Sequence, residues 1–218
     1  MPAQLLPHRG GQSPDRPALT LAEDIAVPLA RLSEACGTAR RSFAMWLARA
    51  TKGPVIWIAP SWQPDQLHAD GMRDFTDPGR FLFIHPKRPE DILWSMEEVL
   101  RSGAVSLVVG DLPGLPGLTA VRRMHLAAET GAAEGSHTPI GLILTPGEGG
   151  AQGIETRWQM MPRHRATLRR WDLIRLRART RPPKSWTIAQ DKPGTGPYPL
   201  MTEAITKSFD VTPERCAK

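Results

Sequence analysis

The sequence predicts an α/β fold in which helices flank both faces of a mostly parallel central sheet. Short, continuous apolar runs recur along the chain, and such runs are typical of strands covered on both faces. Segments between them carry apolar residues three and four positions apart, the pattern of amphipathic helices. This alternation of helices and apolar strands favours a parallel sheet. The 218 residues, 40% of them hydrophobic, are enough for one domain with a sizeable core.

The elements follow one another in a regular order. We expect buried strands at 32–37, 55–60, 80–85, 104–109 and 139–144, and helices at 40–50, 90–102 and 119–130. The first helix follows from Phe43, Trp46 and Leu47, which share one helical face. Pro89 suits the first turn of the second helix, and Gly103 suits its end. Gly131 is expected to end the third.

The pattern changes after residue 150. Segments 155–160 and 171–179 alternate polar and apolar residues around a basic turn, which predicts an antiparallel basic hairpin at the sheet edge. In the second segment, Arg175, Arg177 and Arg179 occupy every other position. We therefore expect these arginines to share one face of the strand.

The ends of the chain differ from its middle. Residues 1–20 are rich in Pro, Gly and polar residues and are expected to form a disordered leader, followed by a core at 21–188 and a flexible tail at 189–218. Within the tail, 201–209 could form a short partner-binding helix. No run approaches the ~20 apolar residues of a membrane span, and no secretory signal stands out. Cys36 and Cys216 are expected to be reduced thiols, so a cytoplasmic location, with nucleoid association allowed, is expected.

The positive charge is concentrated in one segment. The whole chain carries +6 with a pI near 9.9, whereas 157–184 alone holds nine Arg and one Lys against Asp172, or +9. A patch of this kind favours an anionic partner, with nucleic acid first among the candidates.

Eight residues of this segment are candidates for DNA binding. Guanidinium groups two residues apart on a strand lie about 7 Å from one another, a spacing that suits the phosphates of an extended strand. Indole rings beside them could stack on bases. In the alternative, the tryptophans are core and the arginines protect a sheet edge. The candidates are Arg169, Arg170, Arg175, Arg177, Arg179, Arg181, Trp171 and Trp186.

Other kinds of site find no support in the sequence. The six histidines show no metal-binding spacing with each other or with the cysteines, and no hydrolase motif occurs. We therefore expect no metal and no cofactor.

The most specific stretch is 97–111, EEVLRSGAVSLVVGD, which resembles the helix, turn and strand that end at the Walker B aspartate of RecA proteins. Within that superfamily the chain is similar to the ImuA family, RecA-related accessory proteins of bacterial SOS-induced mutagenesis. The similar phrases lie at 31–37, 53–58, 91–98, 119–123, 155–158 and 171–186, so the resemblance covers roughly 20–188. It implies a RecA-like core.

The resemblance fails where RecA proteins bind ATP. A P-loop needs eight residues with two glycines and a lysine, but 37–42 offers six, with one glycine and no lysine. Pro60, Ser61 and Trp62 stand where RecA proteins place a catalytic glutamate. The site is therefore interpreted as a vestigial nucleotide site with a degenerate P-loop, and the chain is not expected to be an enzyme. Its residues are Gly37, Arg40, Arg41, Ser42 and Asp111.

Two roles remain open for parts of this site. Arg40 and Arg41 could contact an anion at a helix N-terminus or could be solvated charges of a first turn. Asp111 is interpreted as structural or vestigial.

The resemblance implies a non-catalytic accessory role in translesion synthesis. The implied partners are an ImuB-type, Y-family-like polymerase partner and an error-prone C-family DNA polymerase, with RecA and DNA as further candidates; self-association is left open, and no membrane partner is expected. The alternatives are a DNA-dependent NTPase or recombinase-like protein and a general basic nucleic-acid-binding protein.

Overall fold

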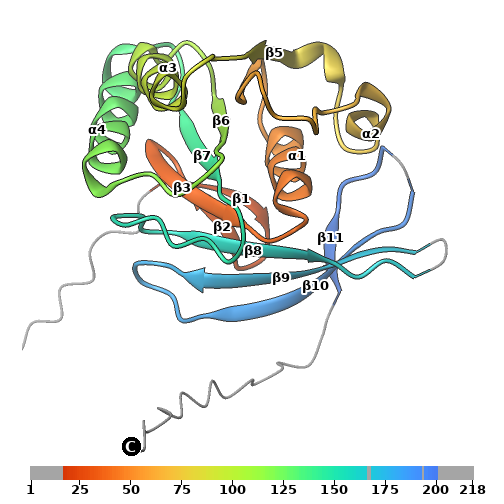
Figure 1. The fold of residues 1–218 in the computed structure, drawn as a ribbon. Coiled ribbons are helices and arrows are strands. Elements are labelled where there is room, and N and C mark those ends of the chain that lie inside the picture. Colours follow the sequence, from red (N-terminus) through yellow and green to blue (C-terminus); the bar gives the residue numbers. More distant parts are fainter. Residues whose placement is uncertain (1–16, 166–167, 193, 201–218) are drawn as a thin grey trace, which may run out of the picture.

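The structure is a computed structural model that describes residues 17–165, 168–192 and 194–200. Most described strands form one nine-stranded sheet (Figure 1). From one edge to the other, the strands are β11 (Tyr198–Leu200), β10 (Lys184–Gln190), β9 (Arg169–Arg177), β8 (Arg157–Pro162), β3 (Arg31–Cys36), β7 (Ile140–Leu144), β6 (Leu107–Asp111), β4 (Val55–Ile58) and β5 (Phe81–Ile84). A separate hairpin consists of β1 (Ala18–Ala22) and β2 (Ile25–Pro28).

The sheet has a parallel part and an antiparallel part. Every neighbouring pair from β8 through β3, β7, β6 and β4 to β5 is parallel. The pairs β8–β9, β9–β10 and β10–β11 are antiparallel. The expected mostly parallel α/β sheet is therefore confirmed, and the expected antiparallel basic hairpin is present as β8 and β9. Its expected position at the sheet edge is wrong, because β10 and β11 continue the antiparallel part beyond it.

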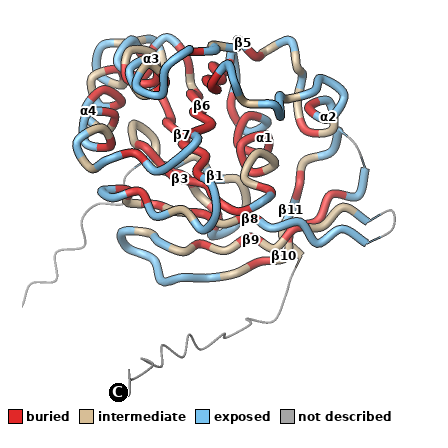
Figure 2. Tube along the Cα trace, viewed as in Figure 1, coloured by how far each residue is buried: buried red, intermediate tan, exposed pale blue. Residues whose placement is uncertain are grey.

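Helices cover both faces of the parallel part. They are α1 (Arg40–Ala50), α2 (Ala69–Arg73), the one-turn η1 (Pro78–Arg80), α3 (Pro89–Ser102) and α4 (Leu118–Glu134). One core cluster joins α1 to the sheet through Phe43, Leu47 and Trp158, and the other joins α3 and α4 to the opposite face through Met96, Leu100 and Met124. Figure 2 shows the buried residues along the elements that meet in these two layers.

Helix α4 runs past the glycine that was expected to end it. Gly131 lies inside α4, where a Cβ would stand 2.0 Å from the carbonyl oxygen of Leu100 in α3. Gly131 therefore permits the close approach of the two helices rather than ending one of them. Gly103 does end α3, with a φ of 55° that suits glycine.

Strand β5 differs from the expectation of a strand covered on both faces. It pairs only with β4 among the described strands, and Leu82 and Phe83 are 57% and 44% exposed. An apolar run alone does not tell a central strand from an edge strand, because that depends on whether another strand pairs with it.

Strands extend past both expected domain boundaries. β1 begins at Ala18, inside the expected leader, and β10 and β11 lie partly or wholly in the expected tail. The segment 201–209 and Cys216 lie outside the described residues. No helix in the described ranges is long and apolar enough to cross a membrane.

The buried His125 in α4 should make the stability of the folded protein depend on pH. Its Nδ1 accepts a hydrogen bond from the backbone N–H of Leu32 at 3.2 Å, and burial lowers the pKa of the imidazole. The unfolded chain therefore binds a proton more readily than the folded one, so stability falls as the pH drops below about 6.5. We expect the urea midpoint to decrease between pH 7.5 and 5.5. A His125→Gln variant should show a smaller decrease, and an identical decrease would contradict this role.

Candidate functional site

Asp111 lies at the centre of a polar cluster at the carboxyl ends of the parallel strands. It is the last residue of β6 and is fully buried. Its Oδ2 accepts hydrogen bonds from Arg41 Nε at 2.7 Å and Gln63 Nε2 at 3.2 Å, and Arg40 Nη2 lies 3.8 Å from Oδ1. Helix α1 supplies both arginines because it begins directly after β3, at the same edge of the sheet. The expected site residues Arg40, Arg41 and Asp111 are thus brought together.

The turn between β3 and α1 directs its backbone donors at the protein itself. Gly37 N–H donates to Gly147 O at 2.9 Å, and Ala39 N–H donates to Met160 O at 3.0 Å. The N–H groups of Arg40 and Ser42 bond within the turn. A phosphate-binding loop needs several consecutive N–H groups turned toward one point. These four groups are not available for that purpose.

Gly37 is required by the packing of this turn. Its φ is +85°, and a Cβ there would lie 2.5 Å from Met160 O in β8. The glycine therefore serves the contact between the turn and β8, which is a different use from the loop glycine of a nucleotide site.

Gln63 is a further member of the cluster and was not expected from the sequence. It follows β4, which lies directly beside β6, and so it reaches the same edge as Asp111. Together, Arg41 and Gln63 occupy Asp111 Oδ2, while Asp111 Oδ1 and Arg40 Nε are buried with no hydrogen-bond partner among the described residues. The carboxylate is thus held mainly by an arginine of its own chain.

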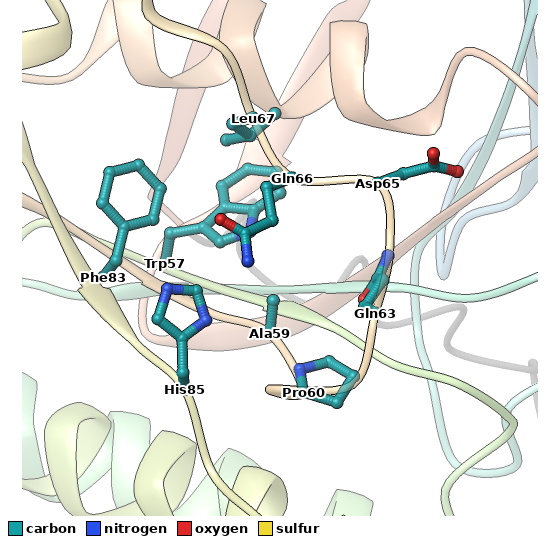
Figure 3. A pocket seen from close by; sticks show the side chains of 9 residues that line it. All are labelled: Trp57, Ala59, Pro60, Gln63, Asp65, Gln66, Leu67, Phe83 and His85. Atoms are coloured by element: carbon teal, nitrogen blue, oxygen red, sulfur yellow. The ribbon is translucent and has the colours of Figure 1, made fainter.

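A cleft of about 120 Å³, open to solvent, adjoins this cluster (Figure 3). Its apolar lining includes Trp57 of β4 and Phe83 of β5, and the ring of His85 stacks parallel to Phe83 with centroids 6.2 Å apart. Gln63 belongs to both the cleft and the cluster. This cleft was not expected from the sequence, because its walls come from segments that only strand pairing brings together.

The two candidate tryptophans are part of the core. Trp171 is 3% exposed and packs against Phe75, with ring centroids 5.9 Å apart. Trp186 is 9% exposed and packs against Trp158 at 5.8 Å. Neither ring presents a free face to solvent in this packing, so the expected base stacking has no geometry to support it here.

Arg175 also lies on the core face. It is 4% exposed, and its guanidinium carbon lies 5.2 Å and 5.9 Å from the ring centroids of Trp186 and Trp158. Its Nη1 donates to Asp24 O at 2.8 Å. Arg175 therefore continues the inward positions of Trp171 and Leu173, so the expected solvent-facing row of three arginines does not form. Two indole faces make this inward position favourable for a cation.

The other candidate arginines form two groups near opposite ends of β9. Arg169 pairs with Asp74 at one end, where Arg170 is half-buried. At the other end Arg177 is exposed, Arg179 Nη1 lies 3.7 Å from Glu155, and Arg181 Nη1 donates to Asp24 O at 3.4 Å. The arginines of the basic segment are thus divided between the two ends of a nine-residue strand.

A second buried carboxylate, Glu34 in β3, has a structural role. It is fully buried and accepts hydrogen bonds from Arg157 Nε at 2.5 Å, Thr145 Oγ1 at 2.6 Å and Gly150 N–H at 2.9 Å. These contacts connect β3 to β8 and to the loop after β7. Among the described residues, no group of three or more His, Cys, Asp or Glu side chains could hold a metal ion.

Cys36, beside Glu34, is expected to be unreactive. Burial, and after it the charge of Glu34, raises the pKa of the thiol to about 11, and Sγ lies 3.1 Å from Glu148 O. Only the thiolate attacks disulfide reagents, so at pH 8 ionisation alone slows labelling on the order of 100-fold. A Cys216→Ala variant leaves Cys36 as the one thiol. Its labelling should be slow when folded and rapid in denaturant, and fast labelling of the folded chain would contradict the prediction.

The fold and the site define an α/β protein whose carboxylate at the end of a central parallel strand is paired with arginine. No protein-family model and no curated protein matches the chain. The solved structures to which it is similar include SulA from Pseudomonas aeruginosa, with 22% sequence identity, a TM-score of 0.44, and coverage of 55% of this chain and 100% of SulA.

Proposed function

We propose that the protein is a non-catalytic accessory protein of DNA damage tolerance, acting in SOS-induced mutagenesis and translesion synthesis. The resemblance to the ImuA family over roughly 20–188 supports this role. In this proposal the parallel sheet with α1, α3 and α4 is a RecA-like core, and the turn at 37–42 is its degenerate P-loop.

The ion pair between Arg41 and Asp111 is the observation that carries the proposal. In a RecA-type enzyme, the carboxylate at this position would hold Mg²⁺ through water. Here Arg41 Nε lies 2.7 Å from Asp111 Oδ2, and the neighbouring N–H groups donate to the protein. An arginine at that carboxylate opposes a second cation by charge repulsion. A core without ATP chemistry suits a protein that acts by binding partners.

The proposed partners are an ImuB-type, Y-family-like polymerase partner and an error-prone C-family DNA polymerase, with RecA and DNA as further contacts. The protein would hold these components together at a stalled replication fork. Its contribution would then be to position the polymerases, and it would carry out no chemical step.

Co-purification tests the bridging role. The full chain and a chain ending at Leu200 are each mixed with the purified polymerase partners from the same genome. The shorter chain keeps every described strand, whereas ending near residue 183 would remove β10 and the core residues Trp186 and Ile188. We expect the full chain to retain the ImuB-type partner. If neither chain retains either polymerase, the bridging role is wrong.

Phosphate release tests the alternative of a DNA-dependent NTPase. We expect no ATP hydrolysis above background with or without single-stranded DNA, because Asp111 is paired with Arg41 and the P-loop is degenerate. An Asp111→Ala variant should give the same background. DNA-stimulated release by the wild type that the variant loses would establish the NTPase.

A further inference from the structure

The antiparallel part of the sheet has one face that neither α3 nor α4 covers. These helices pack on β3, β4, β6 and β7 and lie away from β9 and β10 (Figure 1). We call this the open face. Cross-strand pairing places its side chains in rows, since paired residues point to the same side. The rows are Gln159–Ile174–Ser185, Met161–Asp172–Thr187–Leu200 and Arg170–Ala189–Tyr198.

Side chains of the open face are mostly half-buried or exposed, unlike those of the opposite face. Ile174 and Ser185 are half-buried, and Met161 is 37% exposed. On the opposite face their neighbours Leu173 and Trp186 are buried under the α1 layer. Within the part of the chain that the structure describes, the open face is therefore less covered than the opposite face.

Arginines lie at both ends of the open face. At the hairpin end Arg163 contacts Asp172 Oδ1 at 3.0 Å, and the exposed Arg165 and half-buried Arg170 lie nearby. The hairpin continues past the sheet, with the N–H of Arg163 donating to Arg170 O at 2.8 Å. At the other end, an irregularity in the β8–β9 register skips Leu176 and pairs Arg177 with Arg157, which shares the face of Gln159. Arg177 and, two positions on, Arg179 therefore lie on the open face although Arg175 points inward.

The charge of the open face is positive after its acids are included. This face and its ends carry more arginines than carboxylates. The arginines are Arg163, Arg165, Arg170, Arg177 and Arg179, and the carboxylates are Asp172, Glu155 and Asp191. From Arg170 to Arg177 is seven residue steps, or about 23 Å of strand. Sheets that bind single strands contact about 4–16 nucleotides, and a strand of that length can span the distance between the two ends.

One aromatic ring lies on this face. Tyr198 is 38% exposed and shares a row with Arg170. Its hydroxyl donates to Asp191 Oδ1 at 2.7 Å, which holds the ring in place. A fixed, exposed ring beside an arginine has the two groups that single-strand-binding proteins use, a platform for a base and a cation for a phosphate.

We propose that the open face binds a single nucleic-acid strand, with backbone phosphates at the arginines of both ends and one base stacked on Tyr198. This inference rests on the nucleic-acid contact of the proposed function and gives it a surface. It differs from the expected arginine row, because Arg175, Trp171 and Trp186 take no part in it. An unpaired base is required for stacking, so a single strand fits better than a duplex.

A length series of oligonucleotides tests the surface. Fluorescently labelled oligo-dT of 3 to 15 nucleotides is titrated with the full-length purified chain at low salt. We expect affinity to rise between about 4 and 8 nucleotides, where a strand begins to span both ends, and then to increase slowly. A duplex of equal length should bind more weakly. No binding at low salt, or affinity without length dependence, would overturn the proposal.

Paired variants test the two ends and the ring. Arg165→Ala/Arg170→Ala and Arg177→Ala/Arg179→Ala each remove two charges, as does the control Lys87→Ala/Arg88→Ala, whose residues are exposed near β5. Each end variant should bind about tenfold more weakly and lower the salt slope by about 1.4, at about 0.7 per phosphate on single strands. Tyr198→Ala should also bind about tenfold more weakly, whereas Tyr198→Phe keeps binding.

Three results would overturn the assignment. The control variant could weaken binding as much as the end variants, or Tyr198→Ala could bind like the wild type. Polyglutamate at equal charge concentration could displace the oligonucleotide completely, which would identify an acidic protein segment as the occupant. Thermal midpoints of all variants are measured to show that each remains folded. Because this assay contains no polymerase, its failure is separate from failure of the bridging role.

Discussion

An Arg157→Ala variant should lose about 3–5 kcal/mol of unfolding free energy, because it leaves a buried carboxylate without its cation. Arg157 is the only cation that pairs with Glu34 among the described residues, and the Glu34 side chain is fully buried. Removing the guanidinium leaves a carboxylate charge in the interior, and the remaining donors, the Thr145 hydroxyl and the N–H groups of Gly150 and Ala151, are neutral. Urea denaturation followed by tryptophan fluorescence measures the loss.

Two further variants separate the causes of this loss. Arg177 lies opposite Arg157 in the β8–β9 pairing and is exposed, so Arg177→Ala is a matched control and should change stability by less than about 0.5 kcal/mol. Glu34→Gln combined with Arg157→Met removes both charges and should be less damaging than Arg157→Ala alone. Equal losses in the single and double variants would show that the unpaired charge is not the cause.

An Arg175→Ala variant should be destabilised by about 2–3 kcal/mol, because a buried side chain between two indole rings is removed. The same change also removes the hydrogen bonds to Asp24 O and Pro182 O, which tie β9 to the β1–β2 turn and to the β9–β10 connection. The thermal midpoint and the urea midpoint should both decrease. An unchanged midpoint would mean that Arg175 is not a core residue.

Because Arg175 is a core residue, nucleic-acid binding must be tested with variants that keep it. A combined replacement of Arg175, Arg177 and Arg179 would mix a folding defect with the loss of surface charge. The pair Arg177→Ala/Arg179→Ala avoids this, because Arg177 is exposed and Arg179 is 53% exposed.

Local patterns were sufficient for α1, α3 and most central strands, whereas the short α2 and η1 were not expected. The limits of α1 agree with the expected 40–50, and α3 begins at Pro89 and ends before Gly103 as its sequence indicates. These features depend on neighbours within one or two turns of the same segment. Features that depend on distant segments were missed, among them the edge position of β5, the role of Gly131 and the strands β10 and β11.

The candidate site shows the same division. The absence of a P-loop pattern at 37–42 and the aspartate at 111 could be read directly from the sequence. That Arg41 and Gln63 meet Asp111 could not, because the three residues come from different segments and converge only when β4 and β6 pair side by side and β3 joins the same sheet.

The sequence by itself determined the α/β class, the basic hairpin and the loss of the phosphate-loop residues, since these follow from residue types at short spacing. Only the tertiary structure decided which face of β9 is inward. Alternation defines two faces but does not say which one the core covers, and α1 and the indole of Trp158 lie on the face that carries Arg175. That packing turns an expected binding arginine into a core residue and leaves Arg170 and Tyr198 on the open face.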